Sequence, residues 1–158
     1  MSTENSNLSN FDSSTVPSGD SLTIGLAVSK WNEKITESLF NGAFTTLTDF
    51  GVKSDNIKRI DVPGSFELVF GSKKMIQSNV DVVIAIGCVI KGETKHFDYI
   101  CQSVSKGIVD LNINFDTPVV FCVLTDNNMQ QSIDRSGGIH GNKGVEAAIT
   151  ALKLANLN

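Results

Sequence analysis

The sequence predicts an α/β protein, a three-layer α/β/α sandwich around a central four-stranded parallel sheet. From residue 22 onward, apolar strand-like segments alternate with segments of helical periodicity, and this alternation is typical of parallel strands joined by right-handed crossovers. The longest apolar run, residues 82–90, is continuous over nine residues, as in a strand covered on both faces. A length of 158 residues favours a single domain of this kind.

The expected elements follow in order along the chain. Residues 23–28 form the first strand, and the helical spacing of apolar residues from Ile35 to Phe50 predicts a helix that Gly51 ends. A second strand at 56–62 stops at Pro63-Gly64 and leads into a helix at 66–78. The third strand, 81–90, precedes a helix at about 96–112. After a fourth strand come a short helix, a glycine-rich turn and a last helix, at 118–124, 129–135, 136–142 and 143–157.

Composition argues against several classes of protein. The chain has 13 basic and 17 acidic residues, a net charge of -4, whereas a dedicated nucleic-acid binder needs a concentrated basic face. Cys88, Cys101 and Cys122 are odd in number and lack the spacing of zinc ligands, so neither a disulfide framework nor a metal site is expected. The longest apolar run is far shorter than the roughly 20 residues that span a bilayer. We therefore expect a cytoplasmic protein with no nucleic-acid or membrane partner.

The first 20 residues differ from the rest. They hold six Ser, three Asn and three acidic residues but no Lys or Arg, which fits neither a secretory signal nor a transit peptide. We expect a disordered or extended acidic tail over residues 1–20 and one folded domain over residues 21–158. Since the tail accounts for -3 of the net charge of -4, the folded domain is nearly neutral.

Ligands of parallel α/β sheets bind beyond the carboxyl ends of the strands. In this chain that edge is formed by the segments 29–32, 63–67, 90–96 and 125–128. The third segment joins a buried strand to a helix start, where free N–H groups and a positive helix end attract phosphate. It matches neither a Walker loop nor a dinucleotide fingerprint, and a plain connection is the alternative interpretation.

Several candidate residues have a purely structural interpretation that must be weighed against a functional one. His96 is suited to proton transfer near neutral pH, or it is a capping or solvent-exposed histidine. Ser65 and Glu67 fit a helix cap. Trp31 is either a core residue or a stacking platform for a flat heterocycle. Arg135 is either solvated at a helix end or a partner for phosphate.

Taken together, these segments resemble one family. Residues 21–158 resemble 6,7-dimethyl-8-ribityllumazine synthases, and the resemblance is carried by WNEKIT, VPGSFEL, GCVIKGETKHFDYI, LTDNNMQQSIDRSGG and GNKGVEAA. It implies a sheet with flavodoxin-like strand order. It also implies a transferase of riboflavin biosynthesis that joins 5-amino-6-(D-ribitylamino)uracil to 3,4-dihydroxy-2-butanone 4-phosphate and releases phosphate and water, without a metal or an organic cofactor.

The resemblance assigns a role to each candidate residue. His96 is implied to donate and accept protons. The pyrimidine and its ribityl chain are implied to contact Trp31, Ser65, Phe66, Glu67, Cys88, Val89, Ile90, Phe121 and Lys143, with Phe121 coming from a neighbouring subunit. The phosphate is implied to bind at Glu93 and Thr94, with Arg135 as its guanidinium partner. The chain departs from the family pattern at Trp31, where Phe is common, at Cys122, where Gly is common, and at Glu93, which is a variable position.

The family assembles as pentamers, and in many members twelve pentamers form a shell of 60 subunits. The short GGIHGNKG connection resembles the shell-forming members, and association with riboflavin synthase is a further expectation from the family. Two rival functions are weighed against the enzyme. One is a flavin-binding shell of the same ancestry without catalysis, and the other is a signalling or flavodoxin-like module. The latter lacks its acidic cluster or hydroxyl-rich phosphate loop at 29–32 and 90–92.

Overall fold

A parallel sheet organises the molecule. The computed structural model describes residue 7 and residues 9–157. The strands β1 (Ile24–Ser29), β2 (Ile57–Val62), β3 (Val82–Ile90) and β4 (Val119–Asp126) pair in the order β2-β1-β3-β4, and every neighbouring pair is parallel. The predicted fold class and strand number are therefore confirmed.

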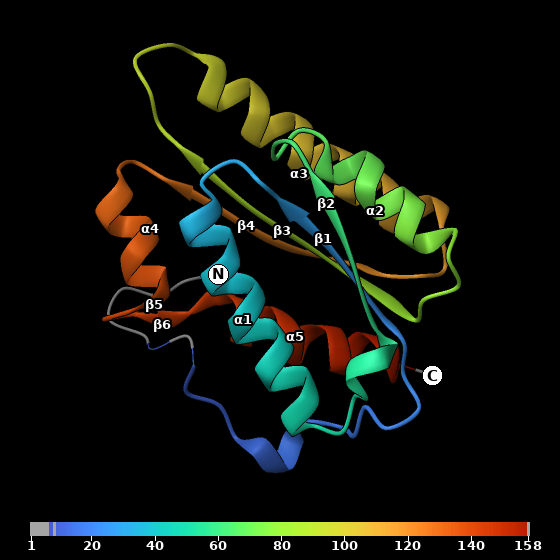
Figure 1. The fold of residues 1–158 in the computed structure, drawn as a ribbon. Coiled ribbons are helices and arrows are strands. Elements are labelled where there is room, and N and C mark those ends of the chain that lie inside the picture. Colours follow the sequence, from blue (N-terminus) through green and yellow to red (C-terminus); the bar gives the residue numbers. More distant parts are fainter. Residues whose placement is uncertain (1–6, 8, 158) are drawn as a thin grey trace.

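Helices cover both faces of this sheet, as Figure 1 shows. α1 (Glu33–Asp49) and α5 (Lys143–Ala155) lie on one face, and α2 (Leu68–Ile76) and α3 (His96–Asn114) lie on the other. Each face has its own apolar core, centred on Leu39, Ile84 and Leu152 on the first and on Leu68, Val83 and Val104 on the second. β3 is the strand between the two cores, which explains its uninterrupted apolar sequence.

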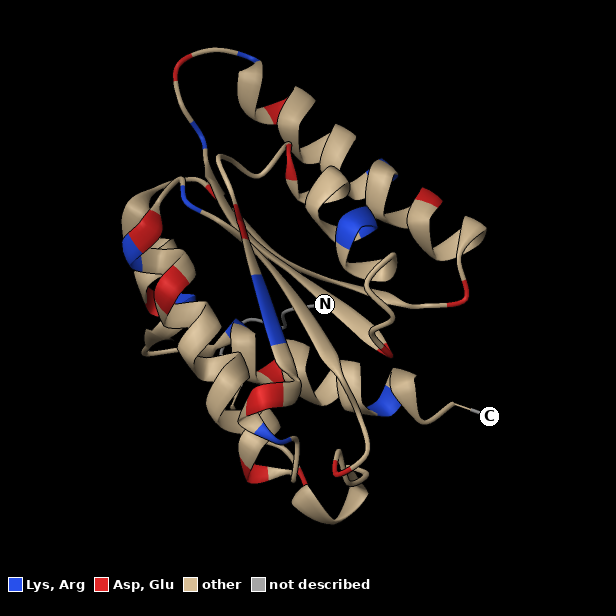
Figure 2. Ribbon diagram, turned by 45° about the vertical axis from the view of Figure 1, so that its right-hand side comes forward, with Lys and Arg blue, Asp and Glu red and all other residues tan. Residues whose placement is uncertain are grey.

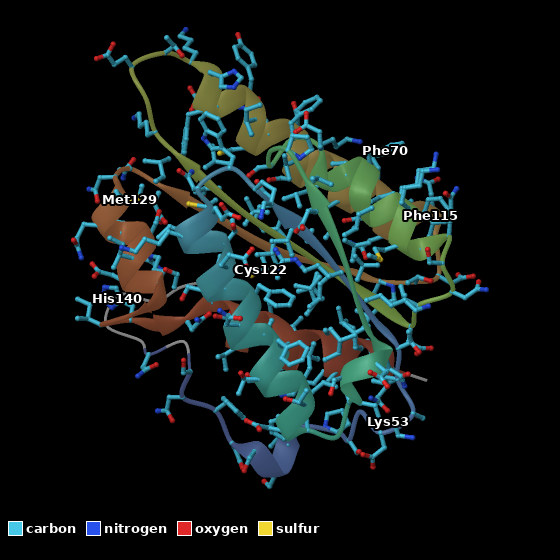
Figure 3. The ribbon with its side chains drawn as sticks, in the orientation of Figure 1. Lys53, Phe70, Phe115, Cys122, Met129 and His140 are labelled. Atoms are coloured by element: carbon cyan, nitrogen blue, oxygen red, sulfur yellow. The ribbon has the colours of Figure 1, made fainter. Side chains whose placement is uncertain are left out.

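The connection after β4 is built differently from the expected turn. The short helix α4 (Met129–Arg135) is followed by a small antiparallel hairpin of β5 (Ser136–Gly138) and β6 (Gly141–Asn142). Gly137 and Gly141 have φ of 119° and 82°, a backbone region that favours glycine. In Figure 3, Met129 marks the start of α4 and His140 marks the hairpin at its other end.

Several boundaries differ from the expected ones. α2 begins at Leu68 rather than at residue 66, because residues 64–67 form turns, and it ends at Ile76 instead of continuing to 78. β4 continues two residues past 124, since Thr125 and Asp126 pair with Val89 and Ile90. That extension places Asp126 beside the end of β3.

The described part of the N-terminal segment lies against α1 and α5. The rings of Phe11 and Phe50 are 6.0 Å apart, the Gly19 N–H donates to the Phe50 carbonyl at 2.7 Å, and the Ser9 hydroxyl accepts from the Asn142 N–H at 3.0 Å. One 3-10 turn, Ser13–Thr15, interrupts its path. Residues 1–6 and 8 of the expected tail lie outside the described residues.

Charge is dispersed over the surface. Figure 2 shows basic and acidic residues interspersed on helices and loops of the view. In the described part of the chain, no helix combines the length and apolar character needed to cross a membrane.

Candidate active site

A cleft opens at the carboxyl edge of the sheet, where the strand-end rule places ligands. Its volume is about 690 Å³, within the range of pockets that hold small molecules. The lining comes from the segments that follow β1 and β2, from the end of β3 and the loop after it, and from the start of α3. The lining residues are Trp31, Asn32, Gly64, Ser65, Phe66, Glu67, Cys88, Val89, Ile90, Gly92, Thr94, His96, Phe97 and Ile100.

The turn after β1 presents an exposed aromatic ring. The Lys30 and Trp31 N–H groups donate to the carbonyls of Val62 and Pro63, at 2.8 and 3.1 Å, which ties this turn to the end of β2. Trp31 is 70% exposed, so it is not a core residue. A large flat ring held at a cleft wall is a stacking surface for a heterocycle.

Asn32 supports this wall in a way that its sequence position does not reveal. It has left-handed backbone dihedrals, φ 59° and ψ 43°, which asparagine tolerates better than most residues. Its side-chain N–H donates to the Cys88 carbonyl at 3.0 Å. The contact joins the segment after β1 to the end of β3, and both residues line the cleft.

Ser65 does not cap α2, so the helix-cap interpretation of this residue is wrong. The N-cap position is Glu67, and no side chain caps the helix there. The Ser65 hydroxyl is buried without a hydrogen-bond partner among the described residues. A buried unpaired hydroxyl costs about 1–3 kcal/mol, and a bound ligand hydroxyl would remove this cost. Phe66 beside it is 55% exposed, while Glu67 is half-buried.

The end of β3 forms the back of the cleft. Cys88 is buried, and Val89 and Ile90 are half-buried. Burial raises the pKa of the Cys88 thiol above its ordinary value, while a hydrogen bond with Ser132 acts in the opposite direction. This cysteine is therefore a neutral wall residue at physiological pH.

The loop from β3 to α3 is the polar end of the cleft. Thr94 and His96 both line it and both are exposed, and the His96 N–H donates to the Thr94 hydroxyl at 3.4 Å. α3 is 19 residues long, and the N-terminus of such a helix carries about half a positive charge. An anion and a proton-transferring imidazole would thus meet at this end. Glu93 is exposed on the same loop but does not belong to the lining.

Besides Glu93, three predicted site residues lie outside the cleft lining. Phe121 projects from the edge strand β4 and is 38% exposed. Lys143 begins α5 and pairs with Glu146, Nζ to Oε1, at 2.6 Å. Arg135 lies in the last turn of α4. A single copy of the chain therefore does not bring these three residues together with Trp31, Thr94 and His96.

Comparison with known proteins adds an independent observation. The sequence profile of the family described as 6,7-dimethyl-8-ribityllumazine synthase matches residues 21–158. The chain belongs to this family.

Full-length relatives agree with the profile. A protein of Flavobacterium johnsoniae named 6,7-dimethyl-8-ribityllumazine synthase is 62% identical, and the match covers 98% of this chain and 82% of the relative. Proteins of the same name from Christiangramia forsetii and Porphyromonas gingivalis are 57% and 54% identical, over 99% of this chain and 95% and 98% of their own lengths. The resemblance read from the motifs is thus confirmed.

Sequence reasoning missed some residues of the lumazine synthase cleft. Asn32, Gly64, Gly92, Phe97 and Ile100 line it but were not among the predicted site residues. Asn32 carried a usable signal, since an asparagine between a strand and a helix often has left-handed dihedrals. Phe97 and Ile100 carried none, because an apolar residue in the first turn of a helix usually belongs to the core.

The described residues contain no group of three or more His, Cys, Asp or Glu side chains that could hold a metal ion. All three cysteines are free thiols. Cys122 lies near the centre of the molecule in Figure 3; complete burial raises the pKa of its thiol to about 12, and the charge of Lys143 offsets this only in part.

Proposed function

We propose that this chain condenses 5-amino-6-(D-ribitylamino)uracil with 3,4-dihydroxy-2-butanone 4-phosphate to give 6,7-dimethyl-8-ribityllumazine, phosphate and water. The observation that carries the proposal is one cleft that combines an exposed aromatic ring, a buried unpaired hydroxyl and a helix N-terminus with a histidine. Membership of the lumazine synthase family supports the same reaction.

The cleft residues divide between the two substrates. Trp31 stacks on the pyrimidine, whose edge meets Cys88, Val89 and Ile90, and Ser65, Phe66 and Glu67 hold the ribityl chain. The butanone phosphate binds at the N-terminus of α3 through Thr94 and the backbone of Glu93. In this arrangement the unpaired Ser65 hydroxyl gains a ribityl hydroxyl as its partner.

The chemistry needs little from the protein besides placement. The substrate's own amine attacks the carbonyl of the butanone, so no protein nucleophile is involved, and holding the two reactants together lowers the barrier by several kcal/mol, about 7–11 at most. Loss of phosphate and closure of the second ring both require proton transfers. His96 at the phosphate end of the cleft performs them, because an imidazole can both donate and accept a proton in the physiological range.

Three of the residues outside the lining complete the site from a neighbouring copy. Phe121 covers the heterocycle, Arg135 binds the phosphate and Lys143 lies near the pyrimidine. Exposed apolar side chains on the α2–α3 face support a subunit contact there, since Phe70, Val109 and Ile113 are 63%, 51% and 74% exposed and such patches mark interfaces.

The assembly is a pentamer, with a 60-subunit shell and association with riboflavin synthase as further steps. The free thiols are typical of the reducing cytoplasm.

Mixing the two substrates with the purified protein tests the reaction. The expected result is fluorescent lumazine formed far faster than in the protein-free mixture. Binding of product or riboflavin without any rate above the uncatalysed condensation would contradict the enzyme and favour a silent flavin-binding shell.

Light scattering of the same preparation tests the assembly. A mass of five or sixty subunits agrees with it, and a monomer would exclude a site shared between copies.

A further inference from the structure

A buried carboxylate lies next to the cleft but outside its lining. Asp126 ends β4 and is only 7% exposed. Its Oδ2 accepts a hydrogen bond from the Ser132 hydroxyl at 2.8 Å, and its backbone carbonyl accepts from the Lys91 N–H at 2.9 Å. A buried carboxylate is kept only where hydrogen bonds and a counter-charge compensate for its lost hydration.

The counter-charge is Arg135. Its Nε lies 3.8 Å from Asp126 Oδ1, although Asp126 ends β4 before α4 begins and Arg135 is the last residue of α4. The contact is possible because helical side chains lean toward the N-terminus, so the Arg135 side chain reaches back along α4 to the sheet edge. Ser132 is three residues before Arg135 and therefore shares its helix face.

The same network reaches the cleft of its own copy, although Arg135 itself lies outside that lining. The buried Cys88 thiol donates to the Ser132 hydroxyl at 3.4 Å, and Cys88 lines the cleft. Because Arg135 contacts Asp126 through Nε, its two terminal guanidinium nitrogens remain available to a ligand. Within the described part of the chain, neither of them makes a hydrogen bond. Those two nitrogens form the fork that suits a phosphate.

We propose that Asp126 is a positioning residue for Arg135 and that Ser132 fixes its carboxylate. The proposal rests on the phosphate role of Arg135 under the proposed function. Asp126 holds the guanidinium in place before substrate arrives, so that less side-chain freedom is lost when the butanone phosphate binds in the cleft of the neighbouring copy. The pyrimidine gains nothing from this contact.

Asp126→Asn tests the proposal, since it removes the charge and keeps an oxygen for the Ser132 hydroxyl. We expect KM for the butanone phosphate to rise about two- to fivefold, the size of one partly exposed ion pair. Inhibition by inorganic phosphate should weaken by the same factor, whereas KM for the pyrimidine should stay within about twofold. Two results would overturn the proposal. An unchanged KM for the butanone phosphate would mean that the carboxylate does not affect phosphate binding, and a lower KM would mean that it competes with phosphate for Arg135.

Two further variants keep the test decisive. Ser132→Ala leaves the charge but frees the carboxylate, and a smaller shift in the same direction is expected; it decides the question if Asp126→Asn does not fold. Asp134→Asn is the matched control, because this carboxylate lies next to Arg135 on α4 and accepts instead from Gln130, Nε2 to Oδ1, at 2.8 Å. Both KM values should be unchanged in the control, and a shift equal to that of Asp126→Asn would overturn the positioning role.

A double-mutant cycle distinguishes the positioning role of Asp126 from the phosphate-binding role of Arg135. Arg135→Ala alone should weaken the butanone phosphate, and adding Asp126→Asn should then have no further effect on its KM. If Arg135→Ala leaves phosphate binding intact, the proposed phosphate role fails. If Arg135→Ala weakens phosphate and the effects of the two changes simply add, the positioning role of Asp126 alone fails.

Discussion

At the scale of single residues, the proposed chemistry depends on where one imidazole lies. His96 is at the first position of α3, exposed to the cleft and next to Thr94. The second histidine, His140, lies in the turn between β5 and β6. The two histidines therefore provide a matched comparison within one chain.

His96→Ala should lower kcat about 10²–10⁴-fold, the usual contribution of a general acid–base group. The folded state should be unaffected, because the side chain is exposed. Product fluorescence measures the rate and circular dichroism checks the fold. His140→Ala should remain within about twofold of the parent; equal losses in the two variants, or an unchanged His96→Ala, would remove His96 from proton transfer.

Cys122 makes stability depend on alkaline pH. Its folded pKa of about 12 exceeds the ordinary value of 9.0, so the unfolded chain loses this proton first. The contribution of the buried thiol is complete below pH 9 and is lost between pH 9 and 12, at up to about 1.4 kcal/mol per pH unit. In urea unfolding, Cys122→Val should show a shallower loss of stability over that range than the parent. Parallel curves would contradict the raised pKa.

Residues at strand ends could be found from the sequence, whereas contacts between strand ends could not. Trp31, Thr94 and His96 were placed at the cleft because parallel strands end at one edge. Two contacts could not be found in this way. The hydrogen bond from Asn32 to Cys88 depends on how the strands are aligned, and the ion pair of Asp126 and Arg135 depends also on the direction of α4. The local sequence pattern specifies neither of them. The cap expected at Ser65 is wrong because α2 begins only at Leu68, after the bends and turns of residues 63–67.

At the scale of elements, the packing of α1 against α5 fixes the layer behind the cleft. A Cβ on Gly144 would lie 1.9 Å from the Leu39 carbonyl oxygen, so only glycine allows the two helices to approach this closely. Alternating strands and helices predicted these elements well, since apolar periodicity identifies each face. The hairpin β5–β6 was read as a turn because two and three residues are too few for a strand signal.

Gly144→Ala should destabilise the protein by about 1–3 kcal/mol or more, because backbone atoms cannot yield as side chains do. Gly92→Ala is the control for stability, since a Cβ there has nothing within 4 Å. Thermal unfolding of both variants measures the difference. A Gly144→Ala protein as stable as the Gly92→Ala protein would contradict the close helix crossing.

At the scale of the whole molecule, the proposed site takes residues from more than one copy of the chain. The cleft holds Trp31, Thr94 and His96, while Phe121, Arg135 and Lys143 lie elsewhere on the same copy. The resemblance to lumazine synthases predicted Phe121 as a neighbour's contribution, and periodicity or composition alone could not, because subunit contacts leave no such pattern. Under the proposed function, one small domain would serve two substrates only as part of an oligomer.

Subunit complementation is the most direct test of this account. His96→Ala and Arg135→Ala chains with different tags are coexpressed, and oligomers that contain both are purified and assayed for lumazine formation. If one copy supplies His96 and its neighbour supplies Arg135, random mixing restores about a quarter of the sites. Activity of the mixed oligomers should then rise well above that of either parent variant. Mixed oligomers no more active than the two parents would contradict a site shared between copies.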